Sequence, residues 1–166
     1  MASRGFSDSQ PRRRRASGMT LIELMVTLVV AAVLLGFGVP SFKAFVQKNR
    51  MASQVNTFLA DLHLARSEAV KRRQSIRVCK STDLAQCSTE GTFNNGWIVV
   101  DEAGAVLRSH GPTSEQILIE DSYEGLITFT GAGIIKASAG NIVFSADGYI
   151  RKLVISNTGR VRIQSD

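Results

Sequence analysis

The sequence predicts an α+β protein in which one long N-terminal helix packs on an antiparallel β-sheet. An apolar stretch near the N-terminus runs into a segment with helical periodicity, and after residue 74 short β-type runs alternate with turn residues. The 166 residues allow one domain with an appendage. With 44% hydrophobic and 20% charged residues, the composition excludes a disordered or collagen-like chain.

The net charge of +6 is distributed unevenly along the chain. Residues 1–18 carry +4, residues 42–78 carry +6, residues 79–149 carry −6 and residues 150–166 carry +3. The isoelectric point of about 9.8 therefore does not indicate a uniformly basic nucleic-acid-binding protein. A basic C-terminal segment follows an acidic one, and this change of sign is the informative feature.

Residues 19–39 form an apolar stretch whose one charged residue is Glu23. As a helix this stretch spans about 31 Å, which is enough to cross a hydrocarbon core of roughly 30 Å. Four arginines precede it at positions 12–15, so the positive-inside rule keeps that end in the cytoplasm. No small-residue secretory cleavage site follows residue 39. We therefore expect residues 19–40 to be transmembrane, with the remainder outside the cytoplasm.

A carboxylate five residues into an apolar span is costly, and such groups are usually functional or paired. Glu23 ends the motif Gly18-Met19-Thr20-Leu21-Ile22-Glu23, which follows a basic leader. The combination resembles the class III signal peptide of type IV pilins and type II secretion pseudopilins. The resemblance implies that prepilin peptidase cuts after Gly18 and methylates the Met19 amine, and that Glu23 pairs with the Met19 amine of a neighbouring subunit during assembly. From the residues alone, a simple single-pass anchor is the alternative.

Helical periodicity continues beyond the apolar stretch, because apolar residues recur at three- and four-residue steps and residues 41–73 contain no Gly or Pro. We predict one helix from about residue 20 to about residue 73, with its second half packed on a globular head. Polar and charged residues, among them Asp61 and Arg66, fill the other positions. The basic ones are expected on a solvated face, with contact to other subunits or to a polyanion as the alternative. The apolar positions are Phe42, Phe45, Val46, Ala52, Val55, Phe58, Leu59, Leu62, Ala65 and Ala69.

Beyond residue 74, β-type runs are separated by turn residues. Turns are expected at 101–104, 147–148 and 157–159, and the acidic pairs Asp101-Glu102 and Glu120-Asp121 are expected in solvated loops. The predicted strands are Ser75–Cys79, Gly96–Val100, Val106–Ser109, Leu126–Thr130, Asn141–Ser145, Leu153–Ser156 and Arg160–Ile163.

Cys79 and Cys87 are the only cysteines of the chain. An extracytoplasmic location favours a disulfide between them. A metal site needs two further ligands, and His63 and His110 show no motif spacing. The sequence contains no Gly-rich phosphate loop, no HExxH and no GxSxG motif. We therefore expect no enzyme, cofactor, metal or small-molecule substrate.

Several segments of the head resemble FimT/GspH-type minor pilins and pseudopilins. They are LHLARSEAVKRRQSIRVC (62–79), NNGWIVVDE (94–102), FSADG (144–148) and SNTGRVRI (156–163), together with Cys87. With the N-terminal motif the resemblance covers residues 18–163. It implies a pilin fold with a leader peptide at 1–18 and a periplasmic head at 41–166. It also implies residence in the bacterial inner membrane before assembly with other pilins into the filament or its tip.

The segment Gly159-Arg160-Val161-Arg162 looks like the GRxR motif of FimT-type minor pilins that bind double-stranded DNA during natural transformation. Arg160 and Arg162 are two apart on a predicted strand, so they point to one face and can grip phosphates with bidentate hydrogen bonds. Arg151 and Lys152, on the preceding strand, are expected to extend the patch. Such contacts are independent of base sequence and sensitive to salt. From chemistry alone, the pattern also fits a hairpin edge with two solvated arginines.

Three hypotheses follow from these features. The chain is a minor type IV pilin that binds DNA for uptake, a minor pilin that only primes and assembles filaments, or a minor pseudopilin of a type II secretion system. If the head binds DNA elsewhere, the basic end of the helix is the next candidate, with Arg66, Lys71, Arg72 and Arg73.

Overall fold

The computed structural model describes residues 18–165, without the side chains of residues 37–40 and Ser165. Of the expected leader, residues 1–18, all but Gly18 lies outside the described residues. The chain divides into two compact units, Met1–Phe42 and Lys43–Asp166. The helix α1 (Leu21–Arg72) belongs to both units, and each unit is described separately below.

In the first unit, α1 begins where the sequence places a helix start signal. Thr20 precedes the helix; its hydroxyl accepts the Glu23 backbone N–H at 3.3 Å, and a Glu23 carboxylate oxygen lies 3.5 Å from the Thr20 nitrogen. This reciprocal arrangement is a capping box. The side chains of residues 21–36 are all exposed. Within the described residues, α1 is long and apolar enough to cross a membrane.

In the second unit, the remainder of α1 buries one face with the predicted helical period. Met51, which the prediction did not include, is the first buried residue on this face, so core contact begins six residues later than Phe45. Phe45, predicted as a packing position, is 63% exposed. The buried apolar residues of this face are Met51, Val55, Phe58, Leu62, Ala65 and Ala69.

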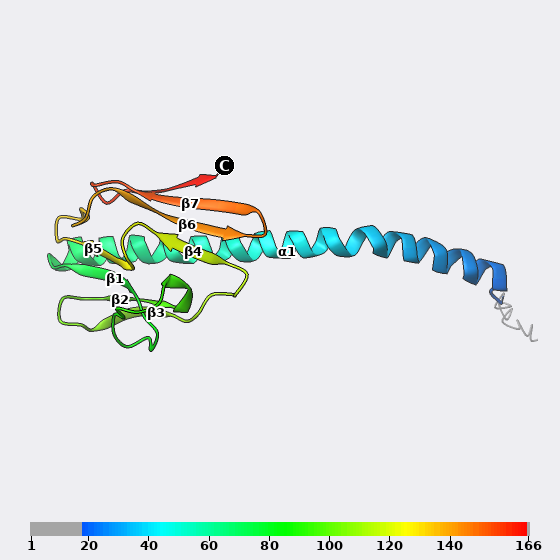
Figure 1. The fold of residues 1–166 in the computed structure, drawn as a ribbon, viewed down its shortest axis with the longest axis horizontal. Helices are drawn as coiled ribbons and strands as arrows, with labels where there is room; N and C mark the ends of the chain where they lie inside the picture. The colour runs from blue at the N-terminus through cyan, green and yellow to red at the C-terminus, as the bar shows by residue number, and fades with distance from the viewer. Residues whose placement is uncertain (1–17, 166) are drawn as a thin grey trace, which may run out of the picture. The chain divides into compact units, whose positions relative to one another are not determined.

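The head contains two antiparallel four-stranded sheets, not one. The first has the order β3-β2-β1-β5 and the second has the order β4-β6-β7-β8. In Figure 1, β6 and β7 run along one side of α1, and β1, β2 and β3 lie on its other side. The strands are β1 (Ile76–Lys80), β2 (Trp97–Val100), β3 (Val106–His110), β4 (Leu118–Asp121), β5 (Leu126–Phe129), β6 (Gly140–Ala146), β7 (Tyr149–Ile155) and β8 (Val161–Ser165).

The second half of α1 and both sheets share one hydrophobic core, with Phe58 near its centre. The Phe58 ring lies 5.0 Å from the rings of Phe93 and Trp97, which belong to the short 3-10 helix η1 (Phe93–Asn95) and to β2. On the other side it lies 5.8 Å from the ring of Phe144 on β6. Edge-to-face contacts at these separations stabilise the packing beyond area burial. One helix residue therefore joins the two sheets.

The predicted strands are confirmed within a few residues at their ends, and β4 is additional. The prediction placed Glu120 and Asp121 in a solvated loop, but both belong to β4, which pairs with β6. Asp121 accepts the backbone N–H groups of Tyr123 and Gly125 at 2.8 and 2.9 Å. Asp101 does lie at a turn, yet it is only partly exposed and accepts the Ala105 N–H at 2.8 Å.

The β7 strand begins at Tyr149 and not at Leu153, because Asp147 and Gly148 form a two-residue hairpin loop. Both residues have positive φ, 44° and 81°, as a type I′ turn requires. This turn pairs Ala146 directly with Tyr149, so the ladder extends to the end of the hairpin.

The predicted disulfide is confirmed. Cys79 and Cys87 are bonded, with 5.5 Å between their Cα atoms. The loop that they close is held by Asp83, whose carboxylate accepts the Ala85 and Gln86 N–H groups at 2.9 and 3.0 Å. Hydrogen bonds to the charged form keep the pKa of Asp83 below its usual value, chiefly those from Ala85 and then from Gln86.

Candidate nucleic-acid interface

The predicted turn at residues 157–159 joins β7 to β8. Its ends are closed by backbone hydrogen bonds from Ser156 N to Arg160 O at 2.9 Å and from Gly159 N to Ser156 O at 2.8 Å. Gly159 has a φ of +74°, a conformation that glycine adopts without strain. The turn therefore sets the direction from which Arg160 and Arg162 leave the backbone.

Arg160 and Arg162 lie together, as their spacing predicts. Arg162 pairs with Val154 across the β7–β8 ladder, and both arginine side chains are exposed. They line one hollow of about 400 Å³ with Val154, Ser156 and Thr158. The hollow thus presents two guanidinium groups and two hydroxyls, and no carboxylate lines it. Such a lining suits an anionic oxygen ligand such as a phosphate.

The structure separates Arg151 from Lys152, which were expected to extend the same patch. Lys152 pairs with Gln164 and lies on the side of the sheet that carries Val154 and Arg162. Arg151 alternates to the opposite side, the side of the buried Leu153. The prediction that Arg151 extends the patch is therefore wrong, and Lys152 remains on the correct face.

Among residues 18–165, neither Arg160 nor Arg162 has a carboxylate within 4.0 Å. The basic end of α1 differs in this respect. Arg72 contacts Glu68 at 2.7 Å and Asp101 at 3.5 Å, and Lys71 contacts Glu68 at 3.5 Å. The hydrogen bond from Arg72 is the main reason that the pKa of Glu68 is below its ordinary value. Lys71 and Arg72 are thus already paired, which disfavours this end as the main anion site.

Arg66, the third residue of that alternative site, is engaged with backbone carbonyls. Its Nε donates to the Gly133 carbonyl at 2.9 Å and its Nη2 donates to the Thr158 carbonyl at 3.0 Å. Arg66 was assigned to the solvated face, so this contact was not foreseen. A signal was present in the Gly131-Ala132-Gly133 segment, because a close backbone approach favours glycine. Lys71, Arg72 and Arg73 are all exposed, and of these Arg73 alone has no carboxylate within 4.0 Å among residues 18–165.

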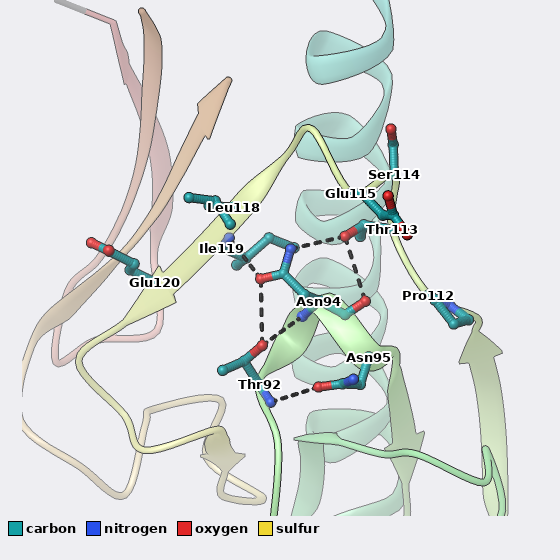
Figure 2. A pocket seen from close by; sticks show the side chains of 10 residues that line it. All are labelled: Thr92, Asn94, Asn95, Pro112, Thr113, Ser114, Glu115, Leu118, Ile119 and Glu120. Atoms are coloured by element: carbon teal, nitrogen blue, oxygen red, sulfur yellow. Dashed lines mark hydrogen bonds between the residues drawn. The ribbon is translucent and has the colours of Figure 1, made fainter. Parts of the chain in front are cut away.

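A second and larger hollow, of about 560 Å³, lies beside β4 (Figure 2). Asn94 organises it: its amide nitrogen donates to Thr113 Oγ1 at 3.1 Å and to the Ile117 carbonyl, and its Oδ1 accepts the Ile119 N–H at 2.9 Å. Glu115 and Glu120 also line this hollow. Two carboxylates repel a polyanion, so the larger hollow is the weaker candidate for nucleic acid.

The expected processing site lies at the start of the described residues. Met19 is 64% exposed, and a Cβ at Gly18 would meet no atom within 4 Å. Glu23, the expected assembly residue, lies in the first turn of α1 and belongs to the capping box. Over residues 18–165, no three His, Cys, Asp or Glu side chains are grouped so that they could hold a metal ion.

Comparisons with known proteins match a different family in each of the two units. Residues 54–159 match the family described as type II transport protein GspH, and residues 13–39 match the family described as the prokaryotic N-terminal methylation motif. None of the curated proteins compared matches the chain.

Two solved proteins share the fold. The type IV minor pilin FimU of Pseudomonas aeruginosa has 25% sequence identity and a TM-score of 0.59, over 72% of this chain and 92% of that chain. A second crystal form of FimU gives 24% identity and a TM-score of 0.53, over 69% and 90%. The minor pseudopilin EpsH of the Vibrio cholerae type 2 secretion system has 10% identity and a TM-score of 0.51, over 70% and 97%, which shows the fold alone.

Proposed function

The chain belongs to the GspH family, as a minor pilin of the GspH/FimT type, and on that premise we propose that its head binds double-stranded DNA for uptake in natural transformation. The observation that carries the proposal is the hollow of Arg160 and Arg162, whose lining offers cations and hydroxyls without a carboxylate. Lys152 lies on the same face and adds a third cation. Binding through phosphates is independent of base sequence.

The proposal includes the route by which the head reaches DNA. Residues 1–18 are the leader, cut by prepilin peptidase after Gly18, and residues 19–40 hold the protein in the bacterial inner membrane with the head, residues 41–166, in the periplasm. The methylation motif and the apolar start of α1 support this route. After assembly with other pilins through Glu23, the filament or its tip presents the β7–β8 turn to DNA.

The sharpest test is the salt dependence of DNA binding. The protein is processed at residue 18, reconstituted in nanodiscs of neutral lipid, and titrated against a short labelled duplex by fluorescence anisotropy. If each arginine neutralises one phosphate, Arg160→Gln/Arg162→Gln reduces the slope of log K against log salt by about 1.8. Affinity falls equally for unrelated sequences. Replacing both arginines with Lys retains part of the affinity and loses the bidentate geometry.

A charge-matched control separates a site from a general effect of net charge. Arg50→Gln/Lys136→Gln also removes two exposed cations, from α1 and from the segment after β5. We expect this variant to keep the wild-type slope. If the Arg160→Gln/Arg162→Gln protein is folded and binds as tightly as wild type at 150 mM salt (about physiological), the assignment of the site is wrong.

A second candidate function is that of a minor pseudopilin in type II secretion, favoured by the description of the matched family and by the fold shared with EpsH. The greater identity and TM-score of FimU favour a pilus. Deletion of the gene distinguishes the two: loss of transformation with normal secretion supports the pilus, and loss of secretion alone supports the pseudopilin. Loss of piliation with intact DNA binding by the remaining pilins supports a minor pilin with an assembly role only.

A further inference from the structure

The arginines of the β7–β8 turn stand on a backbone that is held from α1. We propose that Arg66 is the positioning residue for DNA binding: it fixes the turn that carries Arg160 and Arg162 and does not itself grip phosphate. This inference rests on the proposed function. Its structural part, the fixing of the turn, is testable without DNA.

Three segments that are far apart in the sequence meet at Arg66. Its Nε donates to the carbonyl of Gly133, in the loop after β5, and its Nη2 donates to the carbonyl of Thr158, within the turn. One guanidinium therefore joins the helix to two loops. Because the donors of the guanidinium are fixed in a planar fork, both carbonyls are held at defined positions.

The backbone at this junction is packed without room for side chains. Gly133 and Gly159 are both buried, and both have a φ of +74°. A Cβ on Gly159 would collide with the Gly133 carbonyl oxygen and approach Arg66 Nε to 3.3 Å. The same carbonyl that limits Gly159 is the acceptor of Arg66. The lack of side chains at Gly133 and Gly159 lets the two backbone segments approach closely, and the hydrogen bonds of Arg66 hold them together.

The β7–β8 turn needs the contact from Arg66 because it lies at the edge of its sheet. β8 is an edge strand, and Arg160 precedes its first residue, Val161. The hydrogen bonds at Ser156 and Gly159 close the turn on itself but do not attach it to the core. Attachment beyond the ladder comes from Arg66 and from the Ile135 N–H, which donates to the Asn157 carbonyl at 3.3 Å. Without Arg66, binding must order the turn and loses affinity accordingly.

The experiment compares Arg66→Met with Arg66→Lys and with Arg50→Met, an exposed position about 24 Å away along α1. DNA affinity is measured against salt in the same nanodiscs. We expect Arg66→Met to bind DNA about tenfold more weakly than wild type. The slope of log K against log salt is expected to stay the same, because the number of neutralised phosphates is unchanged. Arg66→Lys keeps the charge but cannot bridge two carbonyls in the same geometry, so it does not restore affinity. Arg50→Met leaves affinity unchanged.

Two outcomes overturn the proposal. A reduction of the salt slope by about 0.9 makes Arg66 a direct phosphate contact. If Arg66→Lys binds DNA as tightly as wild type, the charge of Arg66 and not its hydrogen-bond geometry supports binding. A double-mutant cycle adds a further check: in the Arg160→Gln/Arg162→Gln background, Arg66→Met is expected to cause no additional loss.

Hydrogen exchange without DNA separates this proposal from the proposed function. The peptide covering residues 156–160 is expected to exchange faster in Arg66→Met than in wild type, while the peptides of β6 are unchanged. If wild type and Arg160→Gln/Arg162→Gln bind DNA equally but the turn loosens in Arg66→Met, the DNA function fails and the fixing of the turn stands. If the exchange of the turn is unchanged, the positioning role is wrong whatever the DNA result.

Discussion

The Asp61 carboxylate accepts a hydrogen bond from the Trp97 indole at 2.8 Å, which joins the C-terminal half of α1 to the first residue of β2. Asp61 has no solvent exposure. Arg108 on β3 lies 3.3 Å from its other oxygen, and His110 Nε2 lies 2.9 Å from the oxygen that Trp97 contacts. The Trp97 and His110 rings are stacked, with centroids 5.0 Å apart. A single buried carboxylate therefore ties α1 to β2 and β3 of the first sheet.

Removal of this carboxylate is predicted to destabilise the head. Asp61→Ala leaves the indole N–H buried without an acceptor and Arg108 without its partner, which costs roughly 3 kcal/mol. Trp97 is the only tryptophan, so its fluorescence during urea unfolding in mild detergent reports on the head. Asp61→Asn keeps an acceptor for the indole and is expected to lose less. Glu120→Ala, which removes an exposed carboxylate on β4, is the control. Equal decreases in the free energy of unfolding for Asp61→Ala and Glu120→Ala contradict the prediction.

The contact between Gly159 and Gly133 predicts a second effect. Gly159→Ala combines the strain of a positive φ with a collision against the Gly133 carbonyl, so it destabilises the head and displaces the turn. Gly148→Ala is the matched control, because its φ is +81° and a Cβ there meets no atom within 4 Å. The control is expected to lose about 1 kcal/mol from strain alone. Unfolding followed by Trp97 fluorescence measures the free energy of unfolding of both variants. The prediction is abandoned if Gly159→Ala lowers this free energy no more than Gly148→Ala does.

The loop closed by the disulfide is predicted to loosen in acid. Folding lowers the pKa of Asp83, so its contribution is complete above its unfolded pKa of about 3.9 and is lost as the pH falls through the folded value. Protection of the Ala85 and Gln86 amides from hydrogen exchange is therefore expected to fall below about pH 4. Asp83→Asn removes this dependence, whereas Asp147→Asn, at the exposed β6–β7 turn, does not. Protection that stays constant through the acid range in wild type contradicts the prediction.

At the N-terminus, cleavage and assembly are predicted to depend on different residues. Gly18→Leu leaves the precursor uncut, since the peptidase must fit the residue before the scissile bond. Glu23→Gln keeps the capping box but removes the charge. We expect it to be processed normally and to enter filaments poorly, because the Met19 amine loses its partner. Mass spectrometry measures processing, and the protein recovered in sheared filaments measures assembly. Normal assembly of Glu23→Gln, with failure of Glu23→Ala, assigns Glu23 to capping alone.

The parts of the fold that follow local rules were predictable. The period of apolar residues in α1 depends on neighbours three and four positions away, so it is visible in the sequence. The shared face of Arg160 and Arg162 follows from strand alternation in the same way. That rule also separates Arg151 from Lys152, and its neglect explains the one misplaced site residue.

The remaining features depend on partners that are distant in the sequence. Asp61 resembles any solvent-facing carboxylate of a helix until Trp97 and Arg108, from other elements, are brought to it. β4 was missed because its four residues include an exposed Leu118 and two carboxylates, and its pairing partner β6 begins about twenty residues later. Tertiary pairing overrides the local preference of so short a segment.

The side chain of Asn94 has a consequence for solubility. It occupies the Ile117 carbonyl and the Ile119 N–H, the backbone groups at the start of β4 that another extended chain would otherwise use. An edge strand whose backbone N–H and C=O groups are unpaired can pair with other polypeptides and start cross-β aggregation. Because its amide makes the two hydrogen bonds that a neighbouring strand would make there, Asn94 covers the start of the β4 edge and disfavours association at that point.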